Sequence, residues 1–319
     1  MPQRPVFVQH GLAQNKLRRF VLYVRTANNE SAPIGSSTDF HLIIEQAVRN
    51  REYMMIKSMR SILVGATITP TVSDDERFAQ QLHEAQERAQ ERYPPDWPVF
   101  TGVREVTWWP ARFEATRFPL DALTPVVQKT SSSYHGLPFL WYSPGHFEII
   151  ALQDAVEGVI ASSSAPNRPY TYWQLRQSGL LYRREVMPEA LNVYNNEGSS
   201  LVVGIQITMV HVAEAIDCMV RMGDALGLAS EDVTLRLNLL GVKGATLHTS
   251  RGLLMGRYET ALSDVVHEST RSIEDWTAGK VDLAAEITRD LMLRFNWANV
   301  TSAYFKPDIE AVYAGHFKW

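Results

Sequence analysis

Cysteine is almost absent from this 319-residue sequence, in which Cys218 is the only one. A single cysteine excludes an internal disulfide bond and a cysteine-based zinc site. Cys218 lies in an apolar stretch with helical character, which predicts a buried and unreactive thiol rather than a nucleophile. The lack of disulfide chemistry favours a reducing compartment, so we expect a cytoplasmic protein.

Long apolar runs and targeting signals are missing as well. The N-terminal segment has no apolar core and no small-residue cleavage site, which argues against a signal peptide. A helix that spans a bilayer needs roughly 20 apolar residues in succession. The best candidate, residues 201–226, is interrupted by Gln206, His211, Glu214, Asp217, Arg221 and Asp224. We therefore expect no membrane partner.

Neither sign of charge predominates. Lysine and arginine total 31, aspartate and glutamate total 35, and the formal net charge is -4. This balance provides no overall attraction to nucleic acid or to an anionic membrane, so binding of that kind would need a local basic patch.

Common catalytic and cofactor motifs are not found. The sequence contains no G-x-x-x-x-G-K-[ST] loop, no G-x-G-x-x-G after a strand, no G-x-S-x-G and no H-E-x-x-H. The sequence therefore predicts no cofactor and no metal centre, and it favours a non-enzymatic role without settling it. The glycine turn around Lys243 is interpreted as a β-hairpin turn rather than a phosphate-binding loop.

What is present is typical of an α+β protein. We expect a central, largely antiparallel β region flanked by helices, with a long buried helix in the C-terminal part. Residues 1–93 are expected to form a strand plus a helical region, and 94–319 a β-rich middle followed by an α/β C-terminal domain. Ser73 and Glu76 form a capping box at the start of a polar helix. We interpret that helix as solvated and peripheral; the alternative is a helix that binds a partner.

The most suggestive local feature is a predicted hairpin at residues 170–186, with Gly179 in its turn. Alternation places Tyr170, Tyr172, Gln174 and Arg176 on one strand face, and Tyr182 and Arg184 on one face of the other strand. Aromatic rings beside arginines can stack on bases and neutralise phosphates, although an ordinary sheet with a wet face shows the same alternation. The candidate nucleic-acid contacts are Arg25, Tyr172, Trp173, Arg176, Arg183 and Arg184.

Two other groups of residues offer alternatives. His135 and His146 lie in the segment SSSYHGLPFLWYSPGH, and Asp154 and Glu157 follow it; together they could supply a base and an acid for a hydrolase-type enzyme. His211, Glu214, Asp217 and Arg221 recur at helical spacing, where a histidine–glutamate pair could hold a metal. A solvated or salt-bridged helix face is our preferred interpretation of the second group.

Several segments, taken in order, resemble one family. The strand around Phe20 and Tyr23, a turn with Pro33 and a helix carrying Arg51 are similar to the end of the AlbA_2 (Schlafen-type) domain of bacterial DNA-binding proteins. The hairpin at 170–187 and the turn Leu239–Gly244 resemble the family's later elements. The resemblance covers residues 18–60 and 170–250. The acidic residues with which eukaryotic relatives cut RNA have no counterpart in this sequence, so no catalytic residue is carried over.

The resemblance implies the C-terminal, sensing or scaffolding half of such a protein, working in antiviral defence or in transcription control. Our leading hypothesis is thus a regulatory or recognition module that binds a partner protein or nucleic acid. The hydrolase is one alternative. A structural subunit of a homo-oligomeric assembly is another, suggested by the aromatic C-terminal segment.

Overall fold

The structure is a computed structural model that describes residues 6–8, 21–25, 31–33, 72–94, 101–131, 134, 139–140, 149–160, 170–190, 200–249 and 256–317. Before residue 72, the backbone of three strands is described. The chain divides into two compact units, Met1–Thr71 and Val72–Trp319. The boundary lies earlier than the expected one, so the capped polar helix belongs to the second unit.

The first unit contains a small antiparallel sheet. Its strands are β1 (Val6–Val8), β2 (Val21–Arg25) and β3 (Ser31–Pro33), with β2 in the middle. The strand expected around Phe20 and Tyr23 is therefore confirmed as β2. The helix expected to carry Arg51 lies outside the described residues.

The second unit is built on a seven-stranded sheet in which every neighbouring pair is antiparallel. The strand order is β12-β10-β4-β8-β7-β6-β5. This arrangement confirms the α+β class and the central antiparallel region. The strands are β4 (Val103–Pro110), β5 (Ile150–Ala151), β6 (Ala155–Ile160), β7 (Thr171–Arg176), β8 (Leu181–Val186), β10 (Asp232–Leu240) and β12 (Asp264–Ser272).

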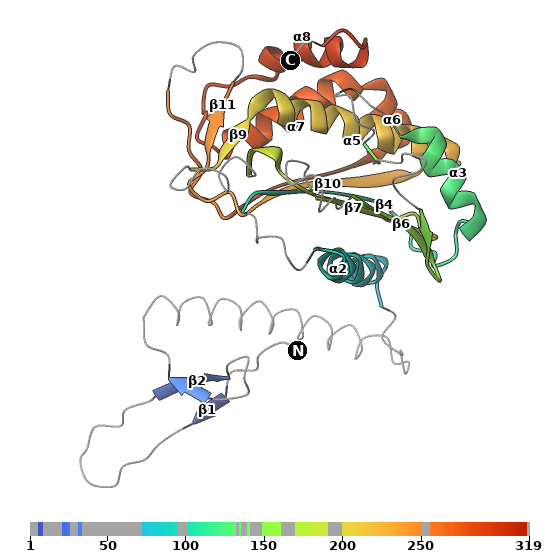
Figure 1. Ribbon diagram of the computed structural model, residues 1–319, viewed down its shortest axis with the longest axis horizontal. Helices are drawn as coiled ribbons and strands as arrows, with labels where there is room; N and C mark the ends of the chain where they lie inside the picture. The colour runs from blue at the N-terminus through green and yellow to red at the C-terminus, as the bar shows by residue number, and fades with distance from the viewer. Residues whose placement is uncertain are drawn as a thin grey trace, which may run out of the picture. The chain divides into compact units, whose positions relative to one another are not determined.

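Helices cover both faces of this sheet (Figure 1). Helix α5 crosses one face together with α3, α6 and α7, and α8 forms an outer layer above α5 and α7. Among the helices that the structure describes, α2 lies on the other face. The helices are α2 (Asp74–Glu91), α3 (Leu120–Thr130), α5 (Ile205–Ala225), α6 (Ile273–Ala278), α7 (Lys280–Leu293) and α8 (Ser302–Tyr313).

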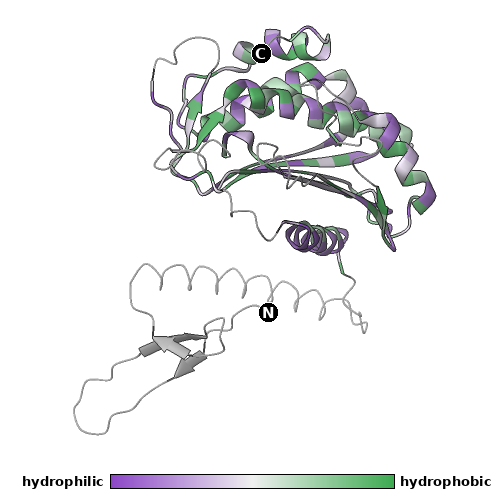
Figure 2. Cartoon of the chain, viewed as in Figure 1, coloured by the Kyte–Doolittle hydropathy of each residue, from purple (hydrophilic) through white to green (hydrophobic). Residues whose placement is uncertain are grey.

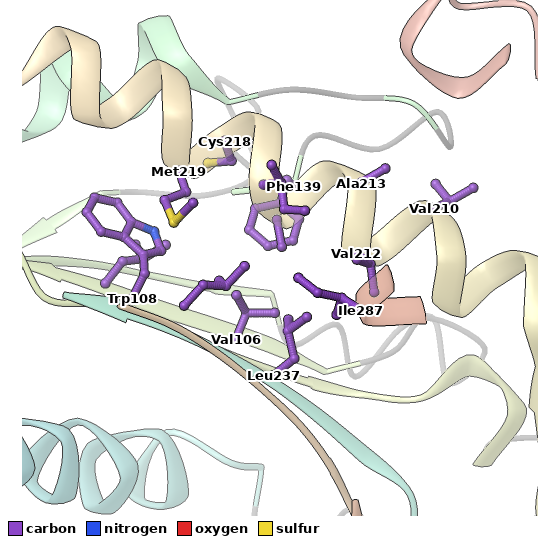
Figure 3. Packing of buried hydrophobic residues seen from close by; sticks show 14 of the residues in the cluster. Val106, Trp108, Phe139, Val210, Val212, Ala213, Cys218, Met219, Leu237 and Ile287 are labelled. Carbon is purple, nitrogen blue, oxygen red and sulfur yellow. The ribbon is translucent and has the colours of Figure 1, made fainter. Parts of the chain in front are cut away.

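The main hydrophobic core lies between the sheet and α5 (Figure 3). Val106, Trp108 and Leu237 project from the strands toward Met219 of α5 and Ile287 of α7. Most of α5 is buried, which confirms the long buried helix that the sequence predicts. Cys218 is completely buried within it, and burial raises the pKa of its thiol well above the ordinary range.

Residues 111–118 form turns and irregular backbone after Pro110 ends β4. Helix α3 follows, and its Leu123 and Val127 face the core one turn apart. One detail of this unit differs from the sequence-based expectation. The turn around Lys243 does not close a hairpin, because β11 (Thr246–His248) pairs in parallel with β9 (Val202–Gly204) instead.

Helix α2 begins as predicted and then differs from the solvated helix that was expected. Ser73 accepts a hydrogen bond from the Glu76 N–H, and the Glu76 carboxylate accepts one from the Ser73 N–H, which completes the capping box. Figure 2 shows α2 as hydrophilic over most of its length, in contrast to α5. Its polar side chains nevertheless make the contacts that hold it on the sheet.

Candidate functional site: the sheet face beneath helix α2

Strand alternation sends the polar side chains of the hairpin to both faces of the sheet. The predicted set of Tyr170, Tyr172, Gln174 and Arg176 does share one face, and it is the face beneath α2. Cross-strand register and hydrogen bonds bring four further side chains to the same face: Glu157 from β6, Tyr182 and Arg184 from β8, and Glu105 from β4.

Glu157 is the main anchor for α2. Its side chain is 0% exposed, and both carboxylate oxygens accept hydrogen bonds from arginines at the end of α2, namely Arg88 and the C-cap residue Arg92. Arg92 donates to Oε1 from Nη2 at 2.6 Å and from Nε at 3.1 Å, and Arg88 donates to Oε2 from Nε at 3.2 Å. The Tyr172 hydroxyl donates to Oε2 at 3.0 Å. Two arginines one helical turn apart therefore converge on one buried carboxylate.

These donors keep Glu157 ionised despite its position. Burial acts to raise the pKa of Glu157, but the hydrogen bonds from Arg88, Arg92 and Tyr172 outweigh it, and the pKa is lowered. The same pairing raises the pKa of Arg88. A general acid would need the opposite shift at Glu157, so the geometry assigns this carboxylate to ion pairing.

Glu105 forms a second buried carboxylate centre on this face. Its Oε1 accepts hydrogen bonds from the Tyr182 hydroxyl at 2.6 Å and from Arg184 Nη1 at 2.8 Å. Its Oε2 accepts longer ones from Gln86 of α2 and Asn238 of β10, both at 3.4 Å. Burial, followed by the charge of Glu105, raises the pKa of Tyr182 well above its usual value. The hairpin arginine Arg184 is thus paired with a carboxylate of the neighbouring strand.

Arg176 makes a third ionic contact with α2. Its side chain is 8% exposed, and Nη1 donates to Glu84 of α2 at 2.8 Å and to Asp154 at 3.1 Å. Nε donates to Gln174 at 2.9 Å. The guanidinium that we expected to contact a phosphate is bound by two carboxylates.

The apolar part of the α2 contact consists of Phe78, Ala85 and Ala89, which are buried, and Leu82, which packs against the core. The Phe78 ring lies edge-on to Phe113 with centroids 4.9 Å apart. The Tyr170 hydroxyl donates to the Ala89 carbonyl at 2.6 Å, which requires the helix backbone to approach the sheet closely. Small residues at this point of α2 allow that approach.

The opposite face carries a separate buried charge cluster beneath α5. Arg183 Nη1 donates to Glu185 at 3.0 Å, and His211 Nε2 lies 3.6 Å from the same carboxylate. Burial acts to raise the pKa of Glu185, but the charges of Arg183, His211 and Arg104 lower it to about 2. The stripe that includes His211, Glu214 and Asp217 is therefore salt-bridged, as one of our two interpretations held, and it is buried rather than solvated.

This second cluster also binds Tyr134 and Phe139, which follow α3 in the sequence. Arg183 Nε donates to the Phe139 carbonyl at 2.8 Å, and its guanidinium stacks 4.6 Å from the centre of the Phe139 ring. The Tyr134 N–H donates to Glu214 at 2.8 Å and its hydroxyl to Asp217 at 3.0 Å. Burial, reinforced by Asp217, raises the pKa of Tyr134 to about 12.

The remaining predicted residues are distributed as follows. Trp173 is completely buried on the α5 side, against Gly158 of β6. Arg25 lies in β2, and its side chain is not described. Asp154 and Glu157 are both engaged by arginines, and His135 and His146 lie outside the described residues. The structure thus brings Tyr172, Arg176 and Arg184 together on one face and separates them from Trp173 and Arg183.

Sequence reasoning did not identify the residues of α2 that complete the site. Glu84, Arg88 and Arg92 repeat every four residues, so they occupy one helix face, and that spacing was a usable signal. Glu105 could not be found in this way, because its role depends on β4 pairing with β8 and β10, which are distant in sequence.

The described residues contain no group of three or more His, Cys, Asp or Glu side chains placed to hold a metal ion. None of their helices combines the length and the apolar character that crossing a bilayer demands. A cleft of about 570 Å³ near the N-terminus of α2 is lined by Arg112, Arg117, Asp74 and Glu231, whose opposite charges favour no ligand of one sign.

Comparison with known proteins identifies no relative. No family model, no curated protein and no solved structure matches the chain. The function must therefore be argued from the site itself.

Proposed function

We propose that this chain is a non-enzymatic, cytoplasmic recognition module that binds a partner protein, and that α2 is the releasable helix that covers its binding face. The observation that carries the proposal is the ionic attachment of α2 to the sheet. Three charged side chains of the helix, Glu84, Arg88 and Arg92, bind charged partners on the strands.

Ionic attachment favours release because charged groups recover their hydration when they separate. Forming a buried ion pair costs desolvation that its attraction only partly offsets, so the net free energy of such a contact is small. Arg88 and Arg92 are each 34% exposed, which weakens their pairs further through solvent screening. Helix α5, by contrast, buries mainly apolar side chains, whose exposure to water would raise the free energy, and it is expected to stay in place.

The position of α2 in the chain supports a regulatory role. It is the first element of the second unit, directly after the boundary at Thr71 and Val72. A pulling force on the first unit, or a conformational change caused by binding there, would act through the chain on α2 before it acted on the sheet.

The charges beneath α2 favour a protein over a nucleic acid as the partner. Release would uncover Tyr172, Tyr182, Arg176 and Arg184, a composition suited to stacking and phosphate contact. It would also uncover Glu105 and Glu157, with Asp154 beside Arg176. Three carboxylates against two guanidinium groups repel a phosphate backbone. The resemblance to Schlafen-type DNA-binding proteins therefore supports a regulatory setting more than direct nucleic-acid contact.

Amide hydrogen exchange read by mass spectrometry tests the release of α2. In the full chain, Arg88→Ala with Arg92→Ala is expected to speed exchange of the α2 amides at least tenfold and to speed exchange of the β7 and β8 amides much less. His83→Ala with Glu87→Ala is the matched control, because that pair lies on the exposed side of α2, with side chains 70% and 64% exposed. The control is expected to change α2 exchange by less than about twofold.

The proposal fails if α2 and the sheet exchange together in both variants. That result would mean that α2 opens only when the whole unit unfolds, so that it is a fixed part of the fold. Equal acceleration of α2 in the control would also contradict the proposal, because the effect would then come from helix propensity rather than from the contacts with Glu157.

A further inference from the structure

The sheet face beneath α2 defines what kind of partner could replace the helix. This inference rests on the proposed release of α2 and adds the chemistry of the partner. We infer that the partner presents a helix with an acid at one position, arginines four and eight positions later, and small apolar residues beside them. The pattern is that of Glu84, Ala85, Arg88, Ala89 and Arg92.

Each requirement follows from a fixed group on the sheet. Glu157 is completely buried and accepts hydrogen bonds from two guanidinium groups, so an occupant must bring two arginines one turn apart. Arg176 is already bound by Asp154, and its contact with Glu84 adds a second carboxylate one turn before Arg88. Acid and arginines therefore lie in a single row, four residues apart.

The space beneath the helix limits the other positions. Ala85 is 0% exposed and Ala89 is 1% exposed, and the Tyr170 hydroxyl reaches the backbone carbonyl of Ala89. A larger side chain at either position would lift the backbone away from that hydroxyl. The face thus selects a helix by its charges and its small residues together, as helix-in-groove recognition generally does.

A free partner helix must compete with the covalently attached α2 for the same sheet face. A tethered segment acts at an effective concentration in the millimolar range, so a free helix of equal affinity displaces little of it. Weakening the attached helix should therefore reveal the site. The double variant Arg88→Ala/Arg92→Ala of the full chain provides such a receptor.

The test is fluorescence anisotropy with a labelled synthetic peptide of residues 72–94. The peptide is expected to bind the double variant at least tenfold more tightly than the wild-type chain. The same peptide with both arginines changed to alanine is expected to bind the double variant at least tenfold more weakly. The control peptide with His83→Ala and Glu87→Ala should bind as the unmodified peptide does. Affinity should fall as salt rises from about 50 to 300 mM.

The outcomes separate this inference from the proposed function. If α2 of the double variant exchanges rapidly while no peptide binds, release stands and the partner chemistry is wrong. If the alanine peptide binds as well as the arginine peptide, the ionic pattern is wrong. If labelled single-stranded DNA or RNA binds the double variant and the peptide does not, the face recognises nucleic acid instead. If α2 does not open, both proposals fall. Near-ultraviolet circular dichroism checks that the variant chain remains folded.

Discussion

At the scale of single residues, this protein places full charges where most proteins place apolar side chains. Glu157, Glu105 and Glu185 are each less than 5% exposed, and each is bound by at least one arginine. Removing one member of such a pair leaves the other charge buried without compensation, which is far more destabilising than the pair is stabilising. The free energy of unfolding is therefore expected to be most sensitive to a change of charge at these buried pairs.

Glu185 provides a direct test, because its pKa is lowered from 4.5 to about 2. A carboxylate with a lowered folded-state pKa stabilises the protein above its unfolded pKa, and this contribution is lost as the pH falls from about 4.5 toward 2. The size of the shift corresponds to about 3 kcal/mol of the free energy of unfolding. Urea unfolding of the wild-type chain should show this loss, and Glu185→Gln should have a lower stability at pH 7 and a shallower dependence on acid.

The control for that experiment is Glu114→Gln, at an exposed position in the turns after β4. It is expected to keep the pH dependence of the wild-type chain. A Glu185→Gln variant that loses stability in acid as steeply as the wild type would show that other carboxylates dominate the acid response.

At the scale of elements, the close fit between β6 and β7 depends on a glycine. A Cβ atom at Gly158 would lie 2.4 to 2.6 Å from atoms of the Trp173 indole, which is directly opposite in the register. Gly158→Ala is therefore expected to lower the free energy of unfolding by about 1–3 kcal/mol through overpacking. Denaturant unfolding followed by circular dichroism measures the change.

A second substitution distinguishes a local clash from a general loss of strand structure. Trp173→Leu makes room for the added methyl group, so the double variant should lose less stability than the sum of the two single changes. Strict additivity would contradict the contact between these two positions as the cause.

Sequence reasoning predicted elements well where one short-range pattern defines them. The capping box at Ser73, the hairpin with Gly179 at φ +91° and the long helix α5 all follow from neighbouring residues. The role of α2 was not predicted, because a polar helix surface has the same sequence pattern whether water or a buried carboxylate lies against it. The arginines of the hairpin pose the same difficulty, since alternation identifies the face on which a side chain lies but not the element that covers that face.

At the scale of the whole molecule, the division at Thr71 and Val72 has a practical use. All eight tryptophans of the sequence lie after residue 71, so tryptophan fluorescence reports on the second unit alone. A chain restricted to residues 72–319 is expected to fold by itself and to unfold in urea with the fluorescence midpoint of the full chain. A midpoint lower by more than about 1 M would show that the first unit stabilises the second, because small domains lose about 1–3 kcal/mol per molar urea.

The ionic attachment of α2 also has a calorimetric consequence. Exposure of apolar surface raises the heat capacity of a protein, whereas exposure of polar surface lowers it. Release of α2 would uncover the carboxylates, guanidinium groups and hydroxyls gathered at Glu157, Glu105 and Arg176, together with the apolar side chains of Phe78 and Leu82, two alanines and the tyrosine rings of the sheet face. The polar surface offsets part of the apolar surface, so the heat-capacity step of this transition should be small. Melting of the sheet and α5 would show the large positive step of an exposed core, so a scanning calorimeter can tell the two events apart.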